Sequence, residues 1–199
     1  MKNIPYFAFT ILICTLLIAA LPTDAEAEIY EDTIRLHILA NSDTKEDQAL
    51  KLEIRDRLLI EYGQILSKSG SFNLASKTVE RLLPEIRSRA EEWIRELGYS
   101  YSVKASLSTE WYDTRDYGDF SLPKGYYTSL RIIIGEGEGQ NWWCVMYPPL
   151  CIDIATESAP TDDGLIDYSK EEIKLISSGK YNIKFKILEE LSALFAKNS

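Results

Sequence analysis

The chain has 199 residues, a formal net charge of −9 and a sequence pI near 4.8. A chain this acidic repels phosphate backbones and anionic lipid headgroups, because binding to either depends on lysine and arginine side chains that displace counterions. Nucleic acid is therefore excluded as a partner. The length suits a single domain that buries most of its apolar surface without a structural staple.

The N-terminus predicts export. Lys2 provides a positive charge and is followed by an apolar stretch over residues 4–20, as in a secretory signal peptide. We expect residues 1–27 to be this signal peptide. An uncleaved membrane anchor is the alternative, although the apolar run is short for a bilayer about 30 Å thick. Residues 28–199 are then one exported domain, which would contact the membrane only through an uncleaved leader.

Residues 33–40 predict the first strand, because bulky apolar side chains alternate along it at Ile34, Leu36, Ile38 and Ala40. Asp43 and Glu46 follow with the spacing of a helix-opening pair, in which each side chain bonds a backbone N–H of the first turn. They predict an amphipathic helix over residues 44–66, with an apolar face of Leu50, Ile54, Leu58, Tyr62 and Ile65.

A second amphipathic helix is predicted between residues 79 and 97, where apolar residues repeat at steps of three and four. Pro84 lies inside this pattern and either kinks the helix or begins its second half. Gly98 predicts the end of the helix, because glycine readily adopts the left-handed conformation that closes a helix.

Alternating and aromatic runs predict three further strands, over residues 99–112, 126–134 and 142–147. The order βααβββ indicates an α+β domain with two long helices packed on a mostly antiparallel sheet. Residues 155–163 predict a surface loop, because they are rich in Thr, Ser, Pro and acidic residues. A strand over residues 181–187 and a short helix over 188–196 are expected to close the chain.

His37 is the single histidine. An imidazole can act as a general base or a metal ligand. No nucleophile motif such as Gly-x-Ser-x-Gly accompanies it, so we expect a surface or half-buried residue with a hydrogen bond. Cys144 and Cys151 add only two soft metal ligands and lack the close paired spacing of zinc motifs. The sequence therefore predicts no catalytic residue, no metal and no cofactor.

The segment over residues 135–139 alternates glycine with glutamate after a predicted strand. Glycine-rich loops of this kind can bring backbone amides close to phosphate. Here Glu136 and Glu138 add negative charge, and no helical pattern follows. A hairpin or loop with left-handed glycines is the expected structure.

Cys144 and Cys151 flank a segment with two adjacent prolines that can turn the chain back on itself. In an exported protein this arrangement favours a disulfide, and two separate buried thiols are the alternative. Trp142 and Trp143 precede this turn and cannot both face the core of one strand. One of them is then either covered by another element or presented to a partner.

Two blocks of sequence match a known pattern. The first extends from Arg35 to Lys51 and contains His-Ile-Leu-Ala-Asn-Ser-Asp at residues 37–43. The second extends from Gly118 to Cys151 and contains the stretches Asn-Trp-Trp-Cys and Pro-Pro-Leu-Cys. Together these blocks resemble the stage II sporulation protein R family.

The resemblance implies a protein made in the forespore of a sporulating bacterium and secreted into the space between the forespore and mother-cell membranes. There it would activate a membrane-embedded aspartic-type protease that removes the pro-sequence of sigma-E. On this interpretation the chain is a ligand rather than an enzyme. Its expected partner-binding residues are Trp142, Trp143, His37, Asn41 and Asp43. An extracytoplasmic wall-binding module or hydrolase is the alternative, with Glu136 and Glu138 as its paired acids.

Overall fold

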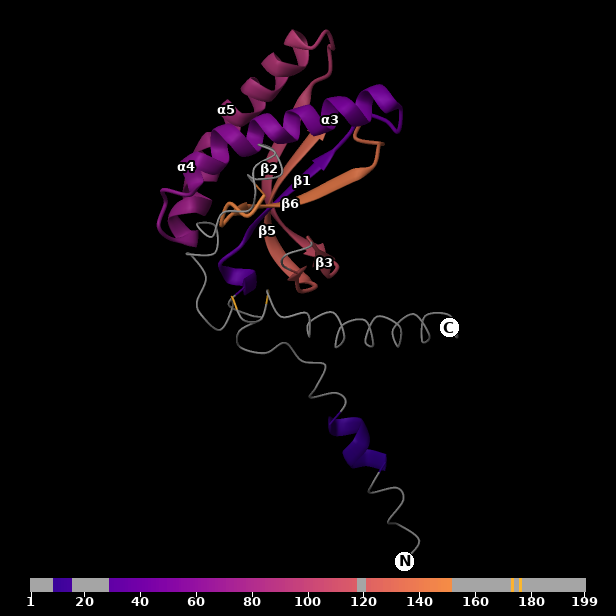
Figure 1. The fold of residues 1–199 in the computed structure, drawn as a ribbon, viewed down its shortest axis with the longest axis vertical. Helices are drawn as coiled ribbons and strands as arrows, with labels where there is room; N and C mark the ends of the chain where they lie inside the picture. The colour runs from indigo at the N-terminus through magenta and orange to yellow at the C-terminus, as the bar shows by residue number, and fades with distance from the viewer. Residues whose placement is uncertain (1–8, 16–28, 118–120, 152–172, 174–175, 177–199) are drawn as a thin grey trace, which may run out of the picture.

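The computed structural model describes residues 9–15, 29–117, 121–151, 173 and 176 (Figure 1). Most of the predicted leader, the predicted loop at 155–163 and the predicted C-terminal strand and helix lie outside the described residues. None of the described helices has both the length and the apolar character needed to cross a membrane.

One four-stranded sheet organises the domain. Its strands are β1 (Ile34–Leu39), β2 (Val103–Tyr112), β5 (Gly125–Ile134) and β6 (Asn141–Tyr147). They lie side by side in the order β2-β5-β1-β6, so β1 is an inner strand. The alternating patterns predicted all four, although the strand predicted from residue 99 begins only at Val103.

The sheet is mixed rather than mostly antiparallel. β5 pairs antiparallel with β2, and β6 pairs antiparallel with β1, but β1 and β5 are parallel. Parallel neighbours need a long crossover, which here contains the helices and β2. Strand direction depends on that path through space, so the local pattern of each strand could not reveal it.

The first helical stretch consists of three parts: α3 (Lys45–Leu58), the π-helical turn η1 (Leu59–Gly63) and α4 (Gln64–Leu66). A π-helical turn inserts one extra residue and so rotates the residues that follow. Leu66 beyond this turn is buried as a result, whereas Ile65 is 40% exposed. Ile65 was wrongly assigned to the apolar face, because a regular helical period misses the inserted residue.

The second helix, α5 (Phe72–Glu96), begins earlier than its apolar repeat suggested. The side chain of Ser71 caps it by accepting a hydrogen bond from the backbone N–H of Leu74. The helix continues through Pro84, which therefore does not begin a separate helix. Gly98 has a φ of 88° just beyond the end of the helix, as predicted for a helix-closing glycine.

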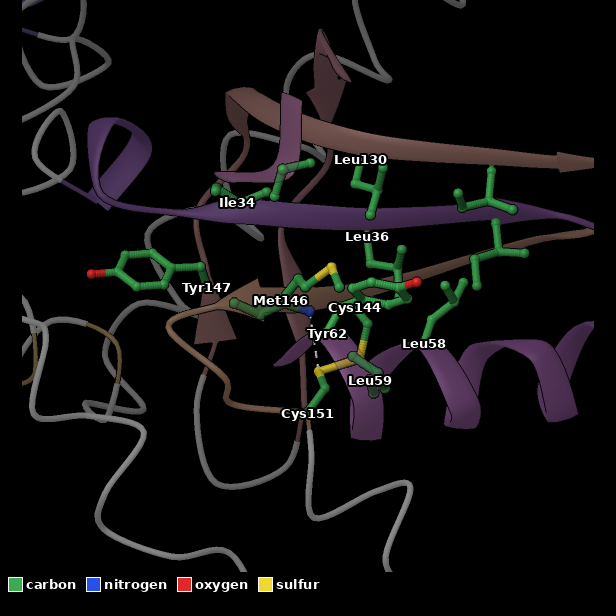
Figure 2. Close-up of a cluster of buried hydrophobic side chains, with 14 of the residues drawn as sticks. Ile34, Leu36, Leu58, Leu59, Tyr62, Leu130, Cys144, Met146, Tyr147 and Cys151 are labelled. Atoms are coloured by element: carbon green, nitrogen blue, oxygen red, sulfur yellow. Dashed lines mark hydrogen bonds between the residues drawn. A yellow bond between two sulfur atoms is a disulfide. The ribbon is translucent and has the colours of Figure 1, made fainter. Parts of the chain in front are cut away.

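Helices α3 and α5 pack on one face of the sheet and on each other (Figure 1). Between these two layers lies a core of fully buried aliphatic side chains, including Leu36, Ile38, Ile54 and Leu58. Each buried residue of this kind contributes about 1.5–3 kcal/mol relative to exposure. Figure 2 shows the part of this core where the helical stretch meets β6.

The opposite face of the sheet carries no helix among the described elements. Lys104, Ser106 and Ser108 of β2 point to this face and are exposed. A small antiparallel pair, β3 (Arg115–Asp116) with β4 (Ser121–Leu122), was not predicted. We call this side of the sheet the open face.

Candidate functional site

His37 lies in the middle of β1 on the open face and is only 9% exposed. Its Nδ1 is 2.9 Å from Oε2 of Glu110 on β2, and its Nε2 is 2.7 Å from Oδ1 of Asn141 on β6. The three residues come from three strands, and β5 lies between β1 and β2. His37 is thus held at both ring nitrogens.

This arrangement limits the chemistry of His37. A general base or metal ligand needs a ring nitrogen whose lone pair faces the substrate or the ion. Here one nitrogen faces a carboxylate and the other faces the amide of Asn141, where a triad would place a hydroxyl or thiol. The described residues also contain no group of three or more acidic, His or Cys side chains arranged to hold a metal.

Trp143 adds an aromatic surface to this cluster. It is paired with His37 in the sheet register, and the two rings stack with centroids 5.7 Å apart. The guanidinium of Arg115, on β3, lies 4.1 Å from the Trp143 ring centroid, which is cation–π distance. Trp143 is half-buried, so part of its ring reaches the open face.

Trp142 points to the other side of the sheet, as alternation requires. Arg55 of α3 lies over its ring, 4.5 Å from the centroid. The indole Nε1 of Trp142 is buried and has no hydrogen-bond partner within the described part of the chain. Trp142 and Trp143 therefore do not belong to one continuous surface.

Asn41 and Asp43 hold the turn between β5 and β6 against the start of α3. Asn41 accepts a hydrogen bond from the backbone N–H of Glu136 and donates one to Asp47. Asp43 accepts a hydrogen bond from the backbone N–H of Gln140, at 2.7 Å. These contacts give both residues a structural role, which the sequence did not indicate for Asn41.

The same contacts correct the predicted helix start. Thr44, rather than Asp43, is the N-cap of α3, and its side chain accepts from the backbone N–H of Asp47. Burial raises the pKa of Asp47, but hydrogen bonds from Ser42 and Asn41 outweigh that effect and hold the pKa below its usual 3.8. Asp47 is thus held as a buried carboxylate that joins the loop to the helix.

The glycine-rich turn is a loop between β5 and β6, which are separated in the sheet by β1. Gly135 and Gly137 have left-handed φ values of 58° and 70°, as predicted. Because its strands are not neighbours, the turn is not a hairpin. Glu136 and Glu138 are exposed on it.

Cys144 and Cys151 form the predicted disulfide, with Cα atoms 6.2 Å apart. Both cysteines are fully buried beside Leu59 and Tyr62 (Figure 2). The backbone N–H of Val145 also donates to the sulfur of Cys151. The bridge therefore links the segment after β6 back to that strand, next to the π-helical turn.

A second cluster, which the sequence did not indicate, lies on the open face around Arg35 of β1. Arg35 is fully buried and donates hydrogen bonds to the carbonyl of Cys144 and the hydroxyl of Tyr117. Its guanidinium carbon lies 4.3 Å from the ring centroid of Tyr112 and 5.1 Å from that of Tyr127. Burying a charge costs several kcal/mol, which these cation–π contacts partly offset.

These observations define a small α/β domain with a mixed sheet, whose open face carries an aromatic and polar cluster centred on His37. The described residues place no serine hydroxyl or cysteine thiol in hydrogen-bond contact with the imidazole. The cluster joins two of the five predicted partner-binding residues, His37 and Trp143. Trp142 lies on the helix-bearing face, and Asn41 and Asp43 lie in the loop after β1.

Comparison with known proteins gives the family. The family model described as stage II sporulation protein R matches residues 30–157. The chain is 33% identical over 166 residues to the stage II sporulation protein R of Bacillus subtilis (strain 168), a match that covers 83% of this chain and 69% of the relative. No solved structure matches the chain. The chain belongs to the stage II sporulation protein R family.

Proposed function

We propose that the chain is a secreted signalling protein of sporulation that activates a membrane-embedded aspartic-type protease by binding it. Activation would start the processing of pro-sigma-E, from the space between the forespore and mother-cell membranes. The chain would act as a ligand and not as an enzyme.

The engagement of both ring nitrogens of His37 carries this proposal. Because Glu110 and Asn141 occupy them, the imidazole is poorly placed to serve as a base toward a substrate. Beside it, Trp143 offers a half-buried aromatic ring fixed by His37 and Arg115. Rigid aromatic residues next to arginine are common anchors in protein interfaces.

A co-expression assay tests the proposal. The chain, with or without residues 1–27, is produced together with the membrane protease and its pro-sigma-E substrate, and processing is followed by immunoblot. Processing should require both the chain and its leader. Processing that persists without the leader would contradict an extracytoplasmic site of action.

Variants of the tryptophans locate the surface. Trp143→Ala is expected to abolish processing while the protein stays folded and secreted, and Trp142→Ala, whose ring lies under Arg55 on the helix-bearing face, is expected to affect processing less. Ser106→Ala is the control, because this exposed serine lies on the open face of β2 outside the His37 cluster. If Trp143→Ala fails to fold, Trp143 belongs to the core instead.

The wall-binding or hydrolase alternative has its own test. The purified chain is incubated with peptidoglycan, and both the bound fraction and released fragments are measured. Glu136 and Glu138 are exposed on a loop, where their carboxylates are poorly held for paired acid and base roles. Specific binding or cleavage of peptidoglycan would favour the alternative over signalling.

A further inference from the structure

The helix-bearing side of the sheet has a hollow that the proposed function does not use. It has a volume of about 540 Å³, within the range of ligand-binding pockets. Its lining comes from the turn before β1, the first turn of α5 and the ends of β2 and β5: Tyr30, Glu31, Asp32, Phe72, Asn73, Thr109, Tyr126 and Thr128. It lies near the N-terminal end of β1, whereas Asn41 and Asp43 follow the opposite end of that strand.

One lining residue of this hollow, Tyr30, is held in place by its neighbours. The hydroxyl of Tyr30 donates to the carbonyl of Lys124, and its ring packs edge-on against Tyr127 at a centroid distance of 5.2 Å. A Cβ on Gly125 would lie only 2.7 Å from the Tyr30 ring, so glycine is needed for this close approach. Tyr30 is therefore held in place at the start of β5 before any ligand arrives.

An exposed aromatic pair continues the hollow outward. Tyr126 is 65% exposed and Trp111 is 53% exposed, and their rings meet edge to face with centroids 5.0 Å apart. Both side chains share the face of the sheet that α5 covers elsewhere. Large aromatic residues that lie exposed together at a pocket are typical of a binding surface.

The charge of the hollow selects the kind of ligand. Glu31 and Asp32 line it, and no lysine or arginine is among its described lining residues. The first turn of α5 contributes a partial positive charge of about half a unit, which the carboxylate of Glu31 alone exceeds. Aromatic rings next to carboxylates attract cations, through the ring faces and through direct charge attraction.

We propose that this hollow binds a lysine- or arginine-bearing peptide segment of a partner protein. The cationic side chain would enter beside the Tyr126 ring, and its charge would face Glu31. This proposal goes beyond the proposed function, and it can fail while protease activation stands, because its test involves neither the protease nor the Trp143 cluster.

A titration of the full chain tests it. The probe is the capped peptide Gly-Lys-Lys-Gly, compared with the same peptide carrying acetylated lysines, and the indole signal of Trp111 is followed by NMR. The lysine peptide should shift this signal in a saturable manner, and added salt should weaken the binding. The acetylated peptide should bind at least about fivefold more weakly, the size of one lost cation–π contact.

Variants distinguish binding in the hollow from non-specific attraction of the peptide to the acidic surface. Tyr126→Ala and Glu31→Gln should each weaken the lysine peptide severalfold, and Tyr126→Phe should retain its binding because the ring remains. Glu138→Gln is the matched control, since this exposed carboxylate lies on the loop after β5, at the other end of the strand. Equal losses in Glu31→Gln and Glu138→Gln would overturn the proposal.

Two further outcomes would also overturn it. Equal binding of the two peptides, or no binding, would show that the hollow does not recognise a cation. A saturable shift with chitotetraose and none with the lysine peptide would instead assign the aromatic pair to glycan binding.

Discussion

Glu110 and His37 meet across an intervening strand, with Oε2 and Nδ1 2.9 Å apart although the residues are 73 positions apart in the chain. Arg131, on the strand between them, lies 3.5 Å from the other carboxylate oxygen of Glu110. One carboxylate thus ties β2, β5 and β1 together on the open face.

Replacing this carboxylate should destabilise the domain. Glu110→Ala is expected to lower the free energy of unfolding by about 1–2 kcal/mol, because a buried ring nitrogen loses its partner. Glu110→Gln should cost less, since the amide oxygen can still accept. Urea denaturation measures both. The control is Glu96→Gln, which removes an exposed partner of Arg57 and should change stability by less than about 1 kcal/mol.

Gly135 and Gly70 form a matched pair for testing the loop after β5. Both are left-handed, with φ of 58° and 68°, but a Cβ on Gly135 would collide with Oδ1 of Asn41, while Gly70 has open space. Gly70→Ala should cost about 1–2 kcal/mol from backbone conformation alone. Gly135→Ala should cost clearly more, because it also displaces Asn41.

The double variant Gly135→Ala with Asn41→Ala isolates the collision. Removing the Asn41 side chain relieves the clash, so the combined loss in unfolding free energy should be smaller than the sum of the two single losses. Strict additivity, measured by urea denaturation of all four proteins, would contradict the contact between Gly135 and Asn41.

The disulfide should stabilise the end of β6. Its cysteines are seven positions apart, and closing a loop of this size removes unfolded-state entropy worth about 2–3 kcal/mol. Cys144→Ala with Cys151→Ala should therefore lower the urea midpoint, and adding a reductant should lower the wild-type midpoint but leave that of the double variant unchanged. An equal effect of the reductant on both proteins would argue against the bridge.

Asp47 predicts a specific dependence on pH. Its folded-state pKa lies below the usual 3.8, so its stabilising contribution is present above that pH and is lost as the pH falls through the folded-state value. Asp47→Asn should be less stable than wild type at pH 7, and the difference should shrink below about pH 4. Unfolding midpoints at pH 7 and pH 3 measure this difference. A gap of the same size at both pH values would contradict the lowered pKa.

Local patterns located the strands and helices because side-chain periodicity records which face of an element is buried. Ile34, Leu36 and Ile38 are fully buried, as their alternation in β1 predicted. The same reasoning failed at Ile65, since a π-helical turn changes the helical period within one element. The β3–β4 pair was missed because strands of two residues are too short to show a period.

The sequence by itself determined the family, the approximate elements, the left-handed glycines and the opposite directions of Trp142 and Trp143, and it favoured the disulfide. Only the tertiary structure decided that β1 and β5 are parallel, that His37 meets Glu110 and Asn141, and that Arg35 lies among tyrosines. The physical reason is distance along the chain. Periodicity, turn residues and cysteine spacing act between near neighbours, whereas these contacts join residues that only the path of the folded backbone brings together.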